Sequence, residues 1–410
     1  MFQPKCVARS STLSNVEQLD EAPGRQPIAS EAFFRSVQWS ADGTSLLASP
    51  SDHSIKTYIV PPDLLEEAAN PHTLAPYCTI RSRDPVNAVV GYPFFNLGDP
   101  ATTLVLSSMR DHPIRLHSAL TGQLGASYPV VNPMTEAFIS PHSLVFSPQG
   151  DRFIAGSESL ISVFDVSRPG QEPVSSIPTG PKNRNATSYD AVMSMRGIVS
   201  ALAVDATTGV LAAGTYSRHI GLYDAMGQGE CIGIFSVRGT DADSHIGGGG
   251  ITQVVWSPCG RYLHIAERKS DGVIIYDIRK TGQLLAWVEG RKAQTNQRLG
   301  VDLASPDASG TIEVWAGGLD GAVRMWKDAQ QSEGAVAPTF EFKAHDGKNM
   351  DTTWVGNLTD LCEDAVSGTV VHPSGGVIAT SSGQRHFDFD SDENKVAAQV
   401  HDNSLKIWEL

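Results

Sequence analysis

The sequence predicts an all-β fold in which seven similar antiparallel sheets close into a β-propeller. The unit is clearest from His142 to Val166, which reads HSLVFSPQGDRFIAGSESLISVFDV. Three short apolar runs alternate with polar residues, are separated by tight turns and end in an aromatic–Asp pair, which is the pattern of one antiparallel sheet. Such a sheet cannot bury both of its faces alone, so it needs neighbours of its own kind.

The same unit recurs along the chain. Its turn glycines are Gly43, Gly150, Gly209, Gly260, Gly310 and Gly375, and its closing aromatics are Tyr58, Phe164, Tyr223, Tyr276, Trp326 and Trp408. Subtracting these positions in pairs gives separations of 15, 14, 14, 16, 16 and 33 residues, so five agree and the sixth contains an insertion. A degenerate copy between Val86 and Leu116 makes seven units. The spacing and the endings resemble WD repeats, which predicts a seven-bladed WD40-type propeller with four strands per blade and no long exposed edge.

Taken in order, the chain divides into an N-terminal segment, residues 1–32, and a propeller, residues 33–410. The seventh unit ends with the chain after its third strand, so a strand within Cys6 to Thr12 is one solution for closing the ring. Residues 167–196 are predicted to be a loop, and residues 328–364 a long acidic connection. Residues 386–395, HFDFDSDENK, are predicted to be a solvated acidic insertion.

Composition narrows the class of protein. Hydrophobic residues make up 40% of the 410 residues, which is enough for a core, and the net charge of −14 argues against a general nucleic-acid coat. The five cysteines show no close pairing and no metal-ligand spacing, which favours a reducing compartment. They are Cys6, Cys78, Cys231, Cys259 and Cys362. Neither a run of eighteen apolar residues nor a signal-peptide core is present, so no membrane contact is expected.

Motifs for catalysis or metal binding are lacking, so the sequence predicts neither an enzyme nor a cofactor. His142 stands where WD repeats use a histidine to hydrogen-bond across a blade. Asp52, Asp271 and Asp320 precede third strands and are expected to cap turn amides. The acidic residues at 388–393 lack the glycine and the distal glutamate of a calcium loop.

Positive charge gathers in one part of this acidic chain. Eight Lys or Arg residues lie between Arg261 and Arg298 against four acidic residues, a local excess of 8 − 4 = +4. Two explanations fit this excess equally well. One is ordinary surface scatter, and the other is a positive patch on blades five and six that attracts phosphate.

Four stretches carry a resemblance to a known family. They are VQWSADGTSLLASPSDHSIKTYIVPPDL at 37–64, SSMRDHPIRLHSALTGQLGASY at 107–128, residues 247–279 with Thr-Asn-Gln-Arg at 295–298, and Ala379 to Arg385. The Thr-Asn-Gln-Arg run at 295–298 and the Ser-Gly-Gln-Arg run at 382–385 are not general features of WD repeats. The chain resembles the telomerase Cajal body protein family. It departs from animal members in lacking a long acidic N-terminal extension and a glycine-rich C-terminal tail, and blade two ends in His117-Ser118 instead of Trp-Asp.

The resemblance implies a non-enzymatic protein that binds a loop motif in small nuclear RNAs of the box H/ACA class, telomerase RNA included, and aids their localisation or assembly in ribonucleoproteins. It implies a nuclear location, in Cajal bodies or nucleoplasm, with the cytoplasm left open. The alternative is a protein-interaction scaffold associated with pre-mRNA splicing. In either case a monomeric propeller is expected.

Single-stranded loops are recognised by stacking and by hydrogen bonds to base edges, which arginine and side-chain amides can supply. The same residue types also hold blades together, so both roles stay open. The RNA-binding candidates that follow are Arg110, His112, Arg291, Lys292, Asn296, Gln297, Arg298, Gln384 and Arg385.

Overall fold

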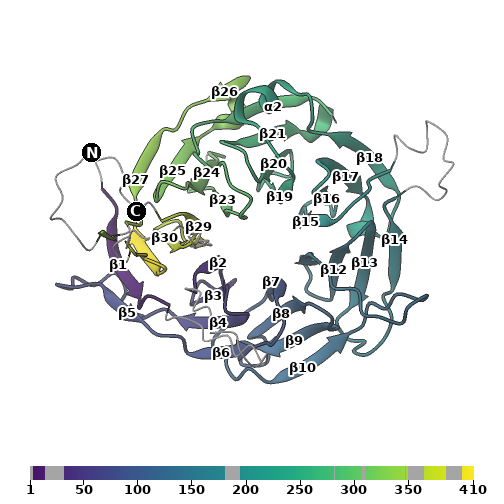
Figure 1. Cartoon of the computed structure of the whole chain (residues 1–410), viewed down its shortest axis with the longest axis horizontal. Coiled ribbons are helices and arrows are strands. Elements are labelled where there is room, and N and C mark those ends of the chain that lie inside the picture. Colours follow the sequence, from purple (N-terminus) through teal and green to yellow (C-terminus); the bar gives the residue numbers. More distant parts are fainter. Residues whose placement is uncertain are drawn as a thin grey trace, which may run out of the picture.

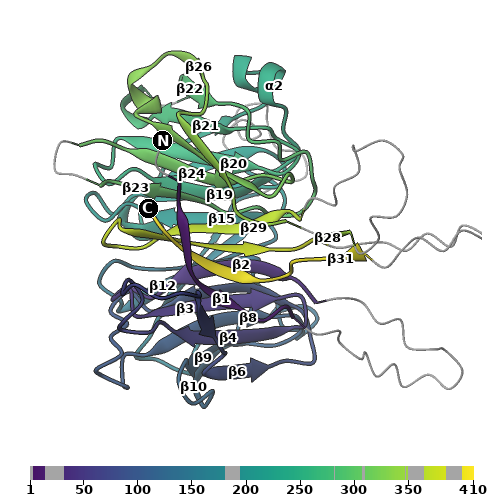
Figure 2. The same cartoon turned by 90° about the vertical axis from the view of Figure 1, so that its left-hand side faces the viewer.

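The computed structural model is a seven-bladed β-propeller (Figure 1). It describes residues 3–13, 32–180, 194–280, 282–306, 310–346, 348–349, 364–384 and 399–410. In these ranges the predicted fold class is confirmed. Seen from the side, the sheets stack around the ring with their strands running between the two faces of the disc (Figure 2).

Blades one to four each contain four antiparallel strands, from the innermost to the outermost. Blade one is β2 (Phe34–Trp39), β3 (Ser45–Pro50), β4 (Ser54–Ile59) and β6 (Cys78–Arg81). Blade two is β7 (Val86–Gly91), β8 (Leu104–Met109), β9 (Ile114–Ser118) and β10 (Leu124–Tyr128). Blade three is β11 (Ser143–Phe146), β12 (Arg152–Ser157), β13 (Leu160–Asp165) and β14 (Ser175–Pro178). Blade four is β15 (Val199–Val204), β16 (Leu211–Thr215), β17 (His219–Tyr223) and β18 (Cys231–Ser236).

The remaining blades share strands with distant parts of the chain. Blade five is β19 (Ile251–Trp256), β20 (Tyr262–Glu267), β21 (Val273–Asp277), β22 (Leu284–Val288) and, parallel to β22, β26 (Gly334–Val336). Blade six is β23 (Val301–Ala304), β24 (Glu313–Gly317), β25 (Ala322–Lys327) and β27 (Phe340–Lys343). Blade seven is β29 (Val366–Val371), β30 (Val377–Ser382), β32 (Leu405–Glu409), β1 (Lys5–Ser10) and β5 (His72–Leu74).

The ring is closed by pairing between the two ends of the described chain. Strand β1 runs antiparallel to β32, with Cys6 opposite Trp408 and Ala8 opposite Ile407. Strand β5 then adds to the outer side of β1 in parallel. Blade seven is therefore built from three separate parts of the sequence.

Two predicted connections contain strands, and these predictions were wrong. The connection 328–364 contributes β26 and β27, because Phe340 and Phe342 provide apolar side chains that pack beside Trp315 and Trp408. The loop 167–196 contributes β14. A short pair, β28 (Lys348–Asn349) and β31 (Gln399–Val400), and one helix, α2 (Asp241–Ile246), were not predicted. Three 3-10 turns complete the description: η1 (Ala225–Gly227), η2 (Ile278–Lys280) and η3 (Ala329–Gln331).

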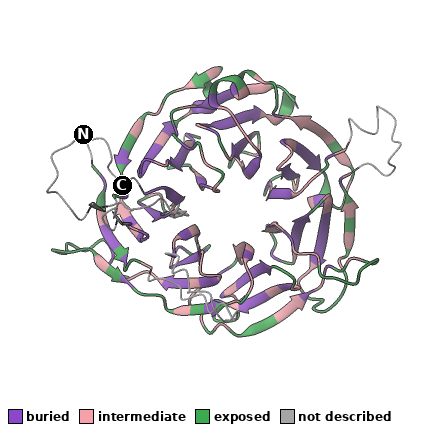
Figure 3. Ribbon diagram, in the orientation of Figure 1, coloured by how far each residue is buried: buried purple, intermediate pink, exposed green. Residues whose placement is uncertain are grey.

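The repeat residues occupy the positions that the pattern predicts. The six turn glycines have φ between 65° and 84°, a left-handed conformation that a side chain would strain. Five closing aromatics, Tyr58 to Trp326, are at most 3% exposed and pack between neighbouring blades. Buried residues therefore fill the spaces between sheets, whereas exposed residues gather on the outer rim (Figure 3). In the described part of the chain, no helix is long and apolar enough to cross a membrane.

Candidate nucleic-acid interface at the channel mouth

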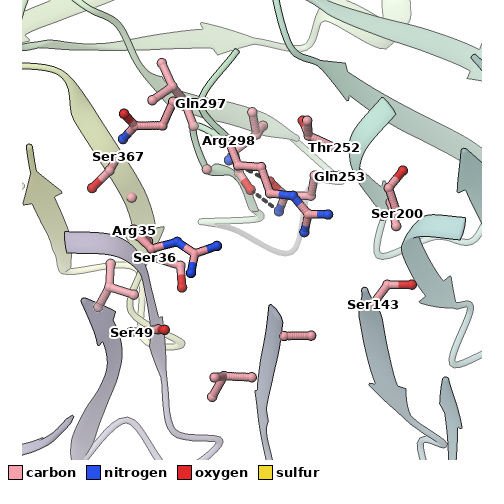
Figure 4. Close-up of a pocket in the computed structure, with 18 of the residues that line it drawn as sticks. Arg35, Ser36, Ser49, Ser143, Ser200, Thr252, Gln253, Gln297, Arg298 and Ser367 are labelled. Carbon is pink, nitrogen blue, oxygen red and sulfur yellow. Dashed lines mark hydrogen bonds between the residues drawn. The ribbon is translucent and has the colours of Figure 1, made fainter. Parts of the chain in front are cut away.

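The central channel contains a cavity of about 830 Å³. The inner strands of the blades form its wall, and polar side chains such as Ser36, Ser143, Ser200 and Thr252 line it (Figure 4). No Asp or Glu stands among its described lining residues, whereas Arg35, His142 and Arg298 do. In a chain of net charge −14 this cavity is therefore locally positive.

β-Bulges turn particular side chains toward this cavity. Five inner strands carry one extra residue near their start, where the pairing register with the second strand shifts. The extra residues are Arg35, Asn87, Ser200, Thr252 and Ser367. A bulge re-aims the side chain of its extra residue, and all five side chains belong to residues that line the cavity.

One face of the disc collects the candidate residues. We call it the top face: on it the inner strands begin and the second strands end. Arg110, Tyr216, Arg268 and Gln384 each follow a second strand, and Arg298 precedes the inner strand β23. The predicted candidates Arg110, Gln384 and Arg298 thus come from different blades but share a face, because the strand order repeats around the ring.

The segment 293–300 crosses the channel mouth on the top face. The Lys269 amide donates to the Thr295 carbonyl (2.8 Å) in blade five, and the Gln297 side chain donates to the Gly383 carbonyl (2.9 Å) in blade seven. The Arg298 guanidinium reaches blade four, where Nη2 and Nε donate to the Tyr216 hydroxyl at 2.8 and 3.2 Å. This run is therefore held in place by three different blades.

Tyr216 lies between two arginines. The Arg268 guanidinium carbon is 4.6 Å from the centre of the Tyr216 ring, and that of Arg298 is 5.6 Å away. Arg268 is itself fixed by a hydrogen bond from its Nε to the Gly249 carbonyl (2.8 Å). The backbone of the glycine run 247–250 thus holds this arginine in place.

Arg35 projects into the cavity beside Arg298 (Figure 4). Its Nη1 donates to the Val86 carbonyl of the next blade (2.8 Å). Burial lowers the pKa of Arg35, and the nearby charge of Arg298 lowers it further. Burial, followed by the charge of Arg298, likewise lowers the pKa of His142. The His142 imidazole lines the channel and forms no hydrogen bond with another residue in the described ranges, so the predicted contact across the blade was wrong.

The histidine contact expected of a WD repeat occurs instead in blade seven. His345 Nε2 lies 2.8 Å from the Thr380 hydroxyl, which also accepts a hydrogen bond from the Trp408 indole (2.9 Å). His345 Nδ1 lies 2.7 Å from Asp402. This network is not evident from the sequence, because an insertion separates Thr380 from Trp408.

Two of the three predicted aspartates cap their own turns: Asp52 accepts the Ser54 amide at 3.0 Å and Asp320 accepts the Ala322 amide at 3.3 Å. Asp271 instead accepts the Ala293 amide at 2.8 Å, so it holds the segment after β22 and the prediction for this residue was wrong. Among the described residues, no group of three His, Cys, Asp or Glu side chains could hold a metal ion.

The candidates between residues 291 and 298 lie in different environments. Arg291 is 1% exposed, and its guanidinium donates to the carbonyls of Leu299 (2.8 Å) and Gly317 (3.2 Å), so it joins strands from within the protein. Burial lowers its pKa to about 10. The Lys292 side chain is 65% exposed but forms an ion pair with Asp320 at 3.1 Å.

The other candidates are more accessible. Asn296 is exposed, and Gln297 and Gln384 are half-buried; all three line the cavity. Arg110 is exposed beside Asp111, and His112 contacts Asp84 at 3.1 Å, farther out on the top face. Arg385 and the acidic insertion at residues 386–395 lie outside the described residues.

The eight basic residues from Arg261 to Arg298 do not form one patch. Arg261 precedes β20 and Arg268 follows it, so the two lie on opposite faces of the disc. Arg279 lies on the same face as Arg261, paired with Asp277 at 2.6 Å, and Arg291 is buried. Of the two interpretations left open, the structure favours surface scatter over a single positive patch, because β20 and β21 divide the cluster between the two faces.

The top-face residues that sequence reasoning missed are Tyr216, Arg268 and Arg35. Tyr216 and Arg268 occupy the place in their blades that Arg110 and Gln384 occupy in theirs, directly after or close to the end of the second strand. Aligning the repeats on their second strands would have found them. Arg35 is a bulge residue, and nothing in the sequence marks it.

Comparison with known proteins places the chain in a family. It is 30% identical over 301 residues to guanine nucleotide-binding protein negative regulator 1 of Schizosaccharomyces pombe, covering 72% of this chain and 71% of that protein. It is 30% and 29% identical, each over 362 residues and 87% of its length, to telomerase Cajal body protein 1 of rat and human. The chain belongs to the telomerase Cajal body protein family. It spans about 60% of the rat protein and 58% of the human one.

Membership agrees with the fold, since the family resemblance implied a WD-repeat propeller and the chain forms one. No family model matches the chain. The names of the rat, human and fission-yeast relatives denote no enzyme; two refer to telomerase and the Cajal body and one to a guanine nucleotide-binding protein.

Proposed function

We propose that this propeller is a non-enzymatic protein that binds small nuclear RNA of the box H/ACA class, telomerase RNA included, across its top face. It would thereby aid the localisation or assembly of ribonucleoproteins in the nucleus, in Cajal bodies or nucleoplasm. The names of the rat and human relatives support the association with telomerase and the Cajal body. The site itself supports RNA as the ligand.

The observation that carries the proposal is the arrangement of Arg298 at the channel mouth. Its guanidinium donates to the Tyr216 hydroxyl and borders a cavity whose described lining residues include no acidic side chain, and Arg298 lies two residues after the exposed Asn296. Unpaired bases are bound by planar side chains on which they stack and by amides that pair with their edges. Arginine also forks onto phosphate, which lysine cannot do. The mouth therefore combines the groups that a single-stranded loop requires.

We assign the contacts by accessibility. Asn296 and Gln384 are proposed to face base edges, with Gln297 positioning the segment through its bond to Gly383. Arg298 is proposed to stack or to bind phosphate. Lys292 forms an ion pair with Asp320, which partly neutralises its charge, and it is therefore proposed as a weaker phosphate contact. Arg110 and His112 would extend the surface outward, Arg385 remains a proposal from sequence, and the buried Arg291 is left out.

Crosslinking followed by RNA sequencing tests this proposal. The intact protein should enrich loop-containing small nuclear RNAs, and the Arg298→Ala variant should lose most of that enrichment. Arg279→Ala is a matched control, because Arg279 lies on the opposite face. Enrichment no greater than that of an unrelated propeller would reject RNA as the ligand.

A protein-interaction scaffold associated with pre-mRNA splicing is the second candidate. It is favoured by the connection between β10 and β11, where Val131 pairs with Phe138 and Met134 is 90% exposed. Exposed apolar side chains gathered in one place are typical of protein contacts. This candidate predicts partners that survive ribonuclease treatment, and no RNA enrichment in the same experiment.

A further inference from the structure

The positive charge in the cavity has no compensation among the described residues. Arg35 and Arg298 both line the cavity, none of the described lining residues is acidic, and neither arginine forms an ion pair with a described residue. Among the residues that the structure describes, the acceptors for their guanidiniums are neutral: the Val86 carbonyl for Arg35 and the Tyr216 hydroxyl for Arg298.

Two other enclosed arginines of this protein have carboxylate partners, whereas the buried Arg291 is held by backbone carbonyls. The Arg218 guanidinium, 9% exposed, donates to Glu267 and Asp243 at 2.7 Å. The Arg324 guanidinium, 4% exposed, donates to Asp320 at 2.6 Å and contacts Glu341 at 3.1 Å. Placing charges out of water without a counter-charge is costly. Two like charges that share a cavity add repulsion, which is why Arg298 contributes to the lowered pKa of Arg35.

The cavity also holds spare neutral donors next to the two arginines. Ser36 is exposed to the cavity and follows Arg35 on β2, and Asn87 is the bulge residue of β7, the neighbouring inner strand. No hydrogen bond joins either side chain to another described residue. Guanidinium forks with adjacent hydroxyl and amide donors are the usual recognition set for a tetrahedral anion.

We propose that Arg35 and Arg298 together clamp a phosphate group in the channel mouth. Arg35, on the first blade, and Arg298, before the sixth, would approach the anion from two sides, with Ser36 and Asn87 completing its contacts. The phosphate belongs either to the backbone of a single-stranded RNA crossing the top face or to a free polyphosphate. Only the first of these sources rests on the proposed function.

Calorimetry with inorganic tripolyphosphate tests the clamp on the purified full chain without any RNA. The wild-type protein should bind tripolyphosphate, and both Arg35→Gln and Arg298→Gln should weaken binding by about 10- to 100-fold, as expected for loss of a charge-assisted hydrogen-bonding group. Arg261→Gln, which removes the same charge from an exposed site on the opposite face, should leave binding unchanged. Equal affinity of all four proteins, or no binding by the wild type, overturns the proposal.

Arg35 also joins two blades, so a second variant separates binding from folding. Arg35→Lys keeps the charge but loses the planar fork, and it should fold with a melting temperature near that of the wild type while binding tripolyphosphate less tightly. If Arg35→Lys melts like the wild type and also binds tripolyphosphate as tightly, while the two Gln variants lose affinity only in proportion to their lowered melting temperatures, the clamp is contradicted.

An oligouridylate titration at several salt concentrations then identifies the source of the phosphate. If RNA supplies it, Arg35→Gln should reduce the salt dependence by about one phosphate contact, a slope change of about 0.7 for a single strand. Tripolyphosphate binding that depends on both arginines, with no RNA binding, supports the clamp and removes the proposed function. If RNA binding depends on Arg298 but is unaffected by Arg35→Gln, and tripolyphosphate does not bind, the proposed function is supported and the clamp is overturned.

Discussion

Asp320 holds two cations at the edge of the top face, and replacing it should measurably destabilise the propeller. Its carboxylate accepts hydrogen bonds from Arg324 at 2.6 and 3.0 Å and from the Ala322 amide at 3.3 Å, and it pairs with Lys292 at 3.1 Å. Burial alone would raise the pKa of Asp320, but the hydrogen bonds from Arg324 and Lys292 outweigh it and lower the pKa to about 2. Asp320→Asn keeps the shape and removes the charge.

The size of the effect follows from linkage. The model value for the unfolded carboxyl is 3.8, so the folded pKa is lower by about 1.8, which corresponds to about 2.4 kcal/mol at pH 7. A lowered folded pKa stabilises the protein above the unfolded value, and this contribution is lost as the pH falls from about 4 to about 2. At pH 3 the ionised carboxyl should contribute only about 1.3 kcal/mol.

Urea denaturation of the wild type and Asp320→Asn at pH 7 and at pH 3 measures this difference. The cost of the substitution should be about 2 kcal/mol at pH 7 and smaller by about 1 kcal/mol at pH 3. Asp346→Asn is the control, because that side chain is 71% exposed and its ion pair with Lys343 is long (3.5 Å), so its cost should stay within about 0.5 kcal/mol. An Asp320→Asn cost that is the same at both pH values would refute the electrostatic reasoning.

Three further predictions concern the ring closure and the top face. Ile407→Ala should destabilise by about 2–5 kcal/mol, because Ile407 is fully buried in the closing strand; a denaturation midpoint near that of the wild type would argue against its place in the core. His345→Leu should cost about 1–3 kcal/mol through its contacts with Asp402 and Thr380, measured in the same way, and a cost below 0.5 kcal/mol or so would show that the network is dispensable. Lys292→Ala should lower the salt dependence of RNA binding by about one unit of slope and weaken all RNAs alike; an effect limited to one RNA sequence would point to base contact instead.

The fold could be predicted because each blade repeats a local signal. A left-handed turn at Gly150 and a buried aromatic at Phe164 are local requirements of one sheet, and they recur at the same spacing. Strands without that signal were missed. Strand β27 has no turn glycine and no closing aromatic–Asp pair; it is defined by tertiary packing of Phe342 against Trp408.

The site could be predicted only in part, because it is assembled from several blades. Sequence alone pointed to Arg298 through a family-like run, but nothing in that run indicates that Tyr216, 82 residues away, accepts its hydrogen bonds. The local excess of basic residues along the sequence was also a poor guide to which side chains are accessible. Arg291 and Lys292 are neighbours in sequence, yet one is buried among carbonyls and the other is largely exposed.

The central claim, that the channel mouth binds RNA through Arg298, is tested most directly by measuring RNA affinity and thermal stability on one preparation of Arg298→Ala. We expect affinity for a single-stranded loop RNA to fall by about 1–3 kcal/mol, the range for losing one stacked base. Arg298→Lys should recover only part of this, and the melting temperature should stay close to that of the wild type. Unchanged RNA affinity together with a lowered melting temperature would contradict the claim, because Arg298 would then serve only to join blade four to the segment 293–300.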